Sequence, residues 1–287
     1  MSDRTVDAVF DIIADTAPEI RATLVDSADF ESEENPSGEE QIAADVYADK
    51  LLEERLLPID GVAQYASEER DGLVVDDDED DGYAIAIDPV DGSSNIETNN
   101  AAGTIIGIYD AELPATGTTL VAAAYVLYGP RTTMVIAREG TVTEYVLEDG
   151  EREIVEEDLR IPDDPGDKGV YGFGGRVPEW TEAFETFARE IEQELKLRYS
   201  GAMIGDVNQV LTYGGIFAYP ALKSAPDSKL RLLYEGNPIG YIVETAGGRS
   251  SDGHRSILEV PAEELHQRVP IHIGTTRYIE QLEATLE

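Results

Sequence analysis

Apolar residues near the start of the chain recur at helical spacing. They predict a helix over residues 6–25, which Pro18 should interrupt or kink because proline removes a backbone hydrogen bond and clashes with the preceding turn. A second helix is predicted to open at residues 37–40, with Asp45 beside its apolar stripe. A salt bridge with Lys50 or Arg55 is the ordinary explanation for an acid there. The first stripe consists of Val6, Val9, Phe10, Ile13, Ala17 and Ile20, and the second of Ile42, Ala43, Val46, Tyr47 and Leu51.

Short apolar runs farther along the chain predict strands. Residues 62–66 and 83–87 form the first two runs, and Pro89 should end the second because proline cannot donate a hydrogen bond to a sheet ladder. Further runs, separated by glycine and proline, lie at residues 103–109, 121–127, 132–137 and 142–147. This succession predicts a meander-like sheet.

A change in composition at residues 161–167, which are rich in proline, aspartate and glycine, predicts a boundary between two parts of the chain. We therefore expect subdomains at residues 1–160 and 161–287. After the boundary, residues 180–195 have the pattern of an amphipathic helix with Phe184, Phe187 and Ile191 inward. The rest of the second half alternates helix and strand.

The segment from Asp88 to Asn95, with the sequence DPVDGSSN, is the most informative part of the chain. Asp88 and Asp91 emerge together at a predicted strand end, and Gly92 permits backbone conformations closed to other residues. Residues 93–95 offer hydroxyl groups and free N–H groups at a helix start, where an anion binds well. A phosphate bridged to the carboxylates by a metal ion would fit, although an ordinary strand-turn-helix connection also explains such residues.

Other acids also follow predicted secondary structure. Glu68 and Glu69 come where the strand at residues 62–66 opens into a loop, and residues 229–234 alternate basic and apolar positions before Glu235. Because the chain has no cysteine, disulfides and thiolate metal sites are excluded, and oxygen ligands remain.

The charge of the chain limits which partners it can bind and indicates the environment in which it works. Sixty Asp and Glu residues against 21 Lys and Arg residues give a net charge of −39, which argues against binding to nucleic acid or to an anionic membrane. With 41% hydrophobic residues the chain is a folded protein, and its five lysines make its composition resemble that of proteins from salt-accumulating archaea. The start has no signal-peptide pattern and no long apolar run occurs, so we expect a cytoplasmic protein. The acidic run at residues 76–81 is typical of a solvated loop.

Basic residues are informative in so acidic a chain. Arg198, Lys223, Lys229 and Arg231 are expected to face an anion, with internal salt bridges to neighbouring acids as the alternative.

Several segments together resemble class 1 fructose-1,6-bisphosphatases, within the superfamily of metal-dependent, lithium-sensitive phosphatases. The resemblance covers residues 38–274 and implies a layered α-β-α-β-α sandwich of two subdomains with the active site in the cleft between them. The segments that carry it are DPVDGSSN and, in the second half, residues 198–203, 213–220, 229–238 and 246–248.

The resemblance also implies roles for the acids. Two or three Mg²⁺ ions, with Mn²⁺ as a possible substitute, would offset the repulsion of carboxylates gathered in one cleft. Glu69 and Asp45 would orient and deprotonate the attacking water, and Glu68 would assist catalysis as well as bind metal. The implied metal ligands are Glu68, Asp88, Asp91, Glu235 and the Val90 carbonyl.

A sugar bisphosphate substrate is implied in the same way. Asp91 and the Gly92 to Asn95 turn would hold the transferred phosphoryl group. The far phosphate and the sugar would contact Arg198, Tyr199, Met203, Tyr219, Lys229 and Arg231. In the family the residue matching Arg198 reaches across a subunit interface, so we expect a homo-oligomer, a tetramer or at least a dimer.

Departures from the family pattern affect the far-phosphate loop and regulation. Gly172 and Gly175 stand where the family has an asparagine and a tyrosine, and Arg176 could substitute for the missing contacts. Positions where relatives inhibited by AMP carry basic residues are Gly82 and Asp110 here, so AMP should not inhibit.

The expected activity is hydrolysis of the 1-phosphate of fructose 1,6-bisphosphate, a step of gluconeogenesis. Alternatives are another sugar bisphosphatase, for example for sedoheptulose bisphosphate, an inositol-monophosphatase-like enzyme, and a non-enzymatic acidic protein that binds cations. His254, His266 and His272 are dispersed along the sequence and are expected to be structural.

Overall fold

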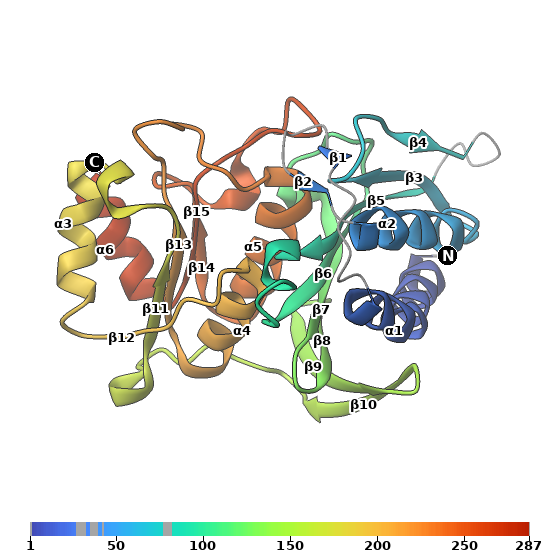
Figure 1. Cartoon of the computed structure of the whole chain (residues 1–287), viewed down its shortest axis with the longest axis horizontal. Coiled ribbons are helices and arrows are strands. Elements are labelled where there is room, and N and C mark those ends of the chain that lie inside the picture. The colour runs from blue at the N-terminus through green and yellow to red at the C-terminus, as the bar shows by residue number, and fades with distance from the viewer. Residues whose placement is uncertain (1, 27–32, 35–39, 42, 77–81, 287) are drawn as a thin grey trace.

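Two large β-sheets organise the chain in the computed structural model, which describes residues 2–26, 33–34, 40–41, 43–76 and 82–286 (Figure 1). The strands are β1 Glu33–Glu34, β2 Glu40–Gln41, β3 Val62–Ser67, β4 Val74–Val75, β5 Tyr83–Asp91, β6 Ala102–Tyr109, β7 Leu120–Tyr128, β8 Thr132–Arg138, β9 Thr141–Glu148, β10 Glu151–Glu156, β11 Val170–Phe173, β12 Lys196–Leu197, β13 Gly215–Tyr219, β14 Arg249–Ser251 and β15 Ile271–Gly274. The α-helices are α1 Ser2–Asp26, α2 Ala43–Leu56, α3 Glu182–Ile191, α4 Met203–Tyr213, α5 Asn237–Thr245 and α6 Thr276–Leu286.

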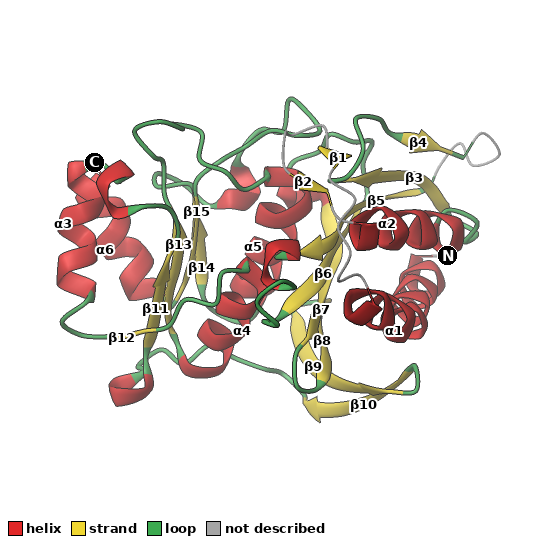
Figure 2. Cartoon of the chain, viewed as in Figure 1, coloured by secondary structure: helices red, strands yellow, loops and turns green. Residues whose placement is uncertain are grey.

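Helices and sheets alternate in five layers (Figure 2). Helices α1 and α2 cover one face of the larger sheet, and α4 and α5 fill the space between the two sheets. The outer face of the smaller sheet packs against α3 and α6. The layered α-β-α-β-α sandwich expected from the sequence is therefore confirmed. No described helix is both long enough and apolar enough to cross a bilayer.

The larger sheet has eight strands in the order β10-β9-β8-β7-β6-β5-β3-β4. All neighbours are antiparallel except β3 and β5, which run parallel and bring their carboxyl ends to one edge of the layer. The predicted meander corresponds to β6 through β9. The smaller sheet has five strands in the order β12-β11-β13-β15-β14, and the chain passes between the sheets after Glu156 and before Val170.

The expectation that Pro89 ends its strand was wrong. β5 continues to Asp91, and the pairing with β6 shifts register between Asp88 and Asp91. Pro89 lies inside this bulge, where the ladder hydrogen bond that proline cannot donate is not required. The bulge places both aspartates at the cleft end of the sheet.

The two N-terminal helices differ in how well the sequence pattern predicts them. All six predicted apolar residues of α1 are buried, and the helix continues through Pro18 rather than ending there. Most of the predicted opening of α2 lies outside the described residues; Glu40 is in β2, and the helix begins at Ala43. The predicted stripe of α2 was wrong, since Val46 and Tyr47 are exposed. The buried face consists of Ala44, Asp45, Ala48, Asp49, Leu52 and Leu56.

The second half of the chain follows the predicted alternation of helix and strand. Helix α3 begins after the N-cap Thr181, whose side chain accepts a hydrogen bond from the Phe184 N–H group, and it buries Phe184, Phe187 and Ile191 as predicted. The alternating segment before Glu235 forms no regular strand; residues Leu232–Gly236 form a π-helix. Of the acidic run at residues 76–81, residues 77–81 lie outside the described part.

Candidate active site

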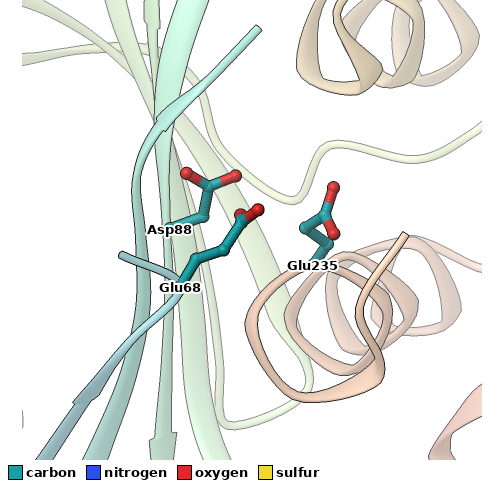
Figure 3. A group of neighbouring side chains, drawn as sticks. All are labelled: Glu68, Asp88 and Glu235. Atoms are coloured by element: carbon teal, nitrogen blue, oxygen red, sulfur yellow. The ribbon is translucent and has the colours of Figure 1, made fainter. Parts of the chain in front are cut away.

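Three acids from separate elements meet at the end of the larger sheet (Figure 3). Glu68 follows β3, Asp88 lies in β5, and Glu235 comes from the π-helix. One carboxylate oxygen of each lies within 4.8 Å of the others, and the side chains point toward one another. The three residues are only 7%, 2% and 3% exposed, so their charges are kept from water.

Hydrogen bonds and an ion pair within the chain hold these carboxylates in place. The Val90 N–H group donates to Asp88 Oδ1 at 3.0 Å, and the Arg231 N–H group donates to Glu235 Oε2 at 2.5 Å. The Arg231 guanidinium is buried and pairs with Glu68 Oε1 at 2.8 Å. The internal salt bridge, which was the alternative for the basic residues of this segment, is thus present at Arg231.

Asp88 and Glu235 retain protons more strongly than ordinary carboxyl groups do. Burial raises the pKa of Asp88 well above its usual range, and the charges of Glu68, Asp91 and Glu235 raise it further. Burial likewise raises the pKa of Glu235, with Glu68 adding to the shift and Arg231 opposing it. One arginine therefore does not balance the cluster.

Asp91 connects the acidic cluster to helix α4. Its Oδ2 accepts a hydrogen bond from the Ile204 N–H group at 2.7 Å, in the first turn of α4. Burial raises the pKa of Asp91 to about 7, and the backbone hydrogen bonds from Ile204 and Met203 hold it below a still higher value. The N-terminus of α4 favours the charged carboxylate because its N–H groups have no partner within the helix.

The donor set fits a hard divalent cation. Every side chain in the described cluster offers a carboxylate oxygen, and the chain contains no cysteine. Buried carboxylates with raised pKa values repel one another, and a divalent cation relieves this repulsion with the ligand type that Mg²⁺ and Mn²⁺ prefer. The buried acidic cluster can therefore hold metal.

A tight turn follows the acids. Gly92 has a φ of +79°, and a Cβ atom there would lie 2.2 Å from the Ala202 Cβ, so any other residue would clash as well as strain the backbone. Residues Ser93–Asn95 form a 3₁₀ turn. Asn95 is buried behind it, and its amide donates to the carbonyl oxygens of Ala101 at 2.9 Å and Ser200 at 3.0 Å.

These elements border one cavity of about 390 Å³. Both halves of the chain line it, and besides the acids it carries tyrosine and lysine side chains. Asn95 and Arg198 are the predicted site residues absent from its wall. The lining residues are Asp45, Glu68, Glu69, Asp88, Val90, Asp91, Gly92, Ser93, Ser94, Tyr199, Gly201, Met203, Phe217, Tyr219, Lys229, Leu230, Arg231 and Glu235.

Comparison with known proteins identifies the relatives of this chain. The model of the fructose-1-6-bisphosphatase N-terminal domain matches residues 6–157, and that of the C-terminal domain matches residues 165–287. The chain belongs to the fructose-1,6-bisphosphatase family. The class 1 fructose-1,6-bisphosphatase of Natronomonas pharaonis is 57% identical over 98% of both chains. That of Halobacterium salinarum is also 57% identical, over 98% of this chain and 97% of the relative.

A solved structure supports the same family. The holo form of Leishmania major fructose-1,6-bisphosphatase has a TM-score of 0.92 and 27% sequence identity, covering 99% of this chain and 95% of that one. The resemblance stated from the sequence motifs is confirmed, and with it the expectation of a phosphatase. Both curated relatives come from halophilic archaea, in keeping with the charge pattern.

Arg198 does not reach the cavity of this fructose-1,6-bisphosphatase chain. It is exposed, its Nη1 lies 3.4 Å from Gln209 Oε1, and its guanidinium carbon lies 5.4 Å from the centre of the Tyr213 ring. Lys223, also expected to face an anion, is exposed and donates to the Pro178 carbonyl oxygen at 2.9 Å. A role for Arg198 toward substrate therefore requires a second subunit or a change of rotamer.

The departures from the fructose-1,6-bisphosphatase pattern have a packing reason at one position. A Cβ atom on Gly172 would lie 2.6 Å from the Arg198 carbonyl oxygen, so this strand leaves no room for a side chain. Gly175 has a φ of +79° and is exposed, as is Arg176. None of these three residues lines the cavity.

Sequence reasoning missed several buried polar residues around the site. Asp206 in α4 is 2% exposed, and its Oδ1 accepts a hydrogen bond from the Ser200 N–H group at 2.8 Å. Asp49 is buried four residues after Asp45 and pairs with Arg70, which directly follows Glu68 and Glu69. The four-residue spacing of Asp45 and Asp49 places them on one face of the helix and could have indicated their burial. The apolar pattern instead predicts a different buried face for α2.

Proposed function

We propose that this chain hydrolyses the 1-phosphate of fructose 1,6-bisphosphate to give fructose 6-phosphate and phosphate, a step of gluconeogenesis. One observation carries the proposal: the buried carboxylates and the Gly92 turn share one cavity with Tyr199, Tyr219 and Lys229. Carboxylates that can hold metal against one phosphate, together with a lysine and two tyrosine hydroxyls that can bind another, suit a substrate with two phosphates. Membership of the fructose-1,6-bisphosphatase family supports the same reaction.

We assign the metal site to carboxylates that the chain already gathers. Asp91 and the Val90 carbonyl would complete the set formed by Glu68, Asp88 and Glu235, with two or three Mg²⁺ ions per subunit and Mn²⁺ as a substitute. When bound, divalent cations would neutralise charge on the phosphate and lower the pKa of coordinated water. The protein contributes ligands whose positions are fixed by β5, the π-helix and α4.

The remaining residues would position the reactants. Glu69 and Asp45 border the cavity beside the carboxylate cluster, where they would orient the attacking water and accept its proton. The N–H groups of Gly92, Ser93 and Ser94 would receive the transferred phosphoryl group, with donors in place before charge develops. No covalent link between phosphate and protein is needed for this displacement.

The far phosphate would contact Tyr199, Tyr219 and Lys229, with Met203 against the sugar and Arg231 in the cavity wall, paired with Glu68. Because Arg198 is exposed and outside the cavity wall, we propose that it serves a neighbouring subunit's site in a homo-oligomer, a tetramer or at least a dimer. We also propose that the chain divides near residue 160 into two subdomains. The change of sheet between Glu156 and Val170 supports that division.

The test is phosphate release from a panel of substrates with Mg²⁺ in molar KCl, which matches the proposed salt-rich cytoplasm. Fructose 1,6-bisphosphate should be the best substrate, and EDTA should abolish release. Preference for sedoheptulose bisphosphate would assign the site to another sugar bisphosphate, an outcome that the glycines at positions 172 and 175 make worth testing. Preference for inositol monophosphate, or no release at all, would refute the proposal.

A further inference from the structure

The turn that presents Glu68 and Glu69 is tied to helix α2 by the next residue, Arg70. The Arg70 guanidinium contacts two carboxylates of α2: Nε pairs with Asp49 Oδ2, and Nη1 lies 2.5 Å from Glu53 Oε2. Asp49 is 5% exposed and is therefore shielded from water, whereas the Arg70 and Glu53 side chains are each 26% exposed. A planar guanidinium can bridge two carboxylates in a way that a lysine cannot.

The same contact is braced from the sheet beneath it. Tyr65 in β3 is fully buried, and its hydroxyl lies 3.0 Å from Asp49 Oδ1 and 3.2 Å from the Asp49 carbonyl oxygen. The Arg70 guanidinium carbon lies 5.6 Å from the centre of the Tyr65 ring. Asp49 is therefore held by β3 and the turn together.

The backbone of Arg70 connects the turn to the second half of the chain. Its carbonyl oxygen lies 2.7 Å from His266 Nε2. The His266 ring packs against the Tyr234 ring, with 5.3 Å between their centres, and Tyr234 directly precedes Glu235. The Arg70 side chain is thus bonded to the helix that carries Asp45, and its carbonyl oxygen is bonded to His266, which packs against the residue before Glu235.

We propose that Arg70 is a positioning residue that fixes the Glu68–Glu69 turn between α2 and the Glu235 segment, so that carboxylates from three elements are set for a divalent cation. This inference rests on the proposed function, because it concerns the same metal site. Asp45 and Asp49 are four residues apart and share the buried face of α2, so one helix carries both the cavity acid and the partner of Arg70. Arg70 itself does not line the cavity and touches no reacting atom.

A matched control is available in the same helix. Arg55 also bridges elements, pairing with Glu19 of α1 at 2.7 Å and donating to Thr16 Oγ1 at 3.1 Å. Its side chain is 31% exposed against 26% for Arg70, so the two arginines are similar in burial. Arg55 has no contact with the turn that carries Glu68. Arg55→Met therefore measures the loss of an arginine bridge on α2 without a change at the cavity.

The experiment compares wild type, Arg70→Met, Arg70→Lys, Asp49→Asn, the double variant of Arg70→Met with Asp49→Asn, and Arg55→Met. Direct Mn²⁺ binding to the metal-free proteins is followed by electron paramagnetic resonance in molar KCl, and Tm is measured without metal. Steady-state kinetics with fructose 1,6-bisphosphate then give kcat and KM separately. Asp49→Asn keeps the oxygen that Tyr65 contacts and removes the charge that Arg70 needs, so it serves where Arg70→Met folds poorly.

We expect Arg70→Met to weaken Mn²⁺ binding and lower kcat by about ten-fold each, the lower end of the range for residues that orient metal ligands, with KM changed by less than about two-fold. Arg70→Lys should recover part of the loss. The double variant should be no worse than the more severe single variant, because both substitutions remove the same contact between Arg70 and Asp49. Arg55→Met should bind Mn²⁺ like wild type.

Wild-type Mn²⁺ affinity and kcat in Arg70→Met would overturn the proposal and leave Arg70 a structural residue. Equal losses in Arg55→Met would also overturn it, since the effect would then be a general weakening of α2. Wild-type protein that neither binds Mn²⁺ nor releases phosphate would refute the proposed function, and this proposal with it.

Discussion

The acidic cluster and the residues proposed for the far phosphate are held in different ways. In the acidic cluster Glu68, Asp88 and Glu235 are less than a tenth exposed, and each is bonded to its neighbours by the backbone or by a buried guanidinium. Among the proposed far-phosphate residues, Tyr199 is 47% exposed, and Arg198 lies outside the cavity on the Tyr213 ring.

The difference follows from electrostatics. Like charges brought together inside a protein repel strongly, so the acidic cluster needs a rigid frame and a cation. Contacts to a phosphate at the surface are worth less individually and can be supplied by mobile side chains or by another subunit. We therefore expect changes in the acidic cluster to lower kcat, and changes at the proposed far-phosphate residues to raise KM.

The largest expected effect is that of Asp91→Asn. The variant keeps an oxygen that can face the Ile204 N–H group but loses the negative charge beside the proposed phosphoryl position. We expect kcat to fall by roughly two to three orders of magnitude, the scale for removing one fixed electrostatic contact to the reacting group, with an unchanged circular dichroism spectrum. A variant with the wild-type rate would show that Asp91 does not bind metal.

Removing salt should affect the acidic cluster and the far-phosphate residues together. At about 0.01 M salt the Debye length is roughly 30 Å, so surface carboxylates of a chain with net charge −39 repel across much of the molecule. Activity and circular dichroism should fall together when KCl is dialysed away, with partial protection by Mg²⁺ because it binds the folded state. Full activity and an unchanged Tm in dilute buffer would show that the acidic surface is not a salt adaptation.

A smaller effect is expected at Arg198, which is proposed to contact the far phosphate. Arg198→Ala should raise KM for fructose 1,6-bisphosphate by about ten-fold, the equivalent of one charge-assisted hydrogen bond, with little change in kcat. Lys223→Ala is the matched control, because Lys223 is also exposed and bonds to a backbone carbonyl. Unchanged kinetics in Arg198→Ala would assign this arginine a structural role on the Tyr213 ring.

The pH dependence of stability tests Asp206, a buried acid of α4. Burial raises the pKa of Asp206 to about 7 from an ordinary value near 4. The folded state therefore holds a proton that the unfolded state has released, and this contribution to the free energy of unfolding is lost as pH rises from about 4 through about 7.

The comparison is between wild type and Asp206→Asn, unfolded by urea in molar KCl with EDTA. From pH 5.5 to 7.5 the free energy of unfolding should fall by about 2 kcal/mol less in the variant than in wild type. Each pKa unit corresponds to about 1.4 kcal/mol. The exposed Asp110, changed to Asn, controls for the loss of one carboxylate. Parallel curves for wild type and Asp206→Asn would contradict the raised pKa.

The last prediction is that AMP has no effect on the rate. A Cβ atom on Gly82 would lie 2.8 Å from the Ala63 amide nitrogen, so a long basic side chain has no room there, and Asp110 is an exposed acid. Millimolar AMP should leave the rate unchanged in molar KCl. Strong inhibition by micromolar AMP would reveal an effector site elsewhere on the molecule.

Much of the fold could be predicted from the sequence because its signals are local. The apolar face of α1, the strands of the meander and the inward face of α3 follow from residue spacing that the structure retains. The face of α2 was predicted wrongly because Asp45 and Asp49 are buried there as polar residues. A pattern that expects acidic residues to be exposed to solvent is wrong where those residues have partners inside the protein.

By itself the sequence determined the positions of Asp88, Asp91 and Gly92 at a strand end, because neighbouring residues share one backbone path whatever packs around them. Only the tertiary structure decided which distant charges meet. Arg231 pairs with Glu68 rather than facing outward, Arg70 pairs with Asp49, and the Arg198 guanidinium lies on the Tyr213 ring. Each choice depends on the burial and the distance between elements far apart in the chain, and electrostatic energy changes steeply with both.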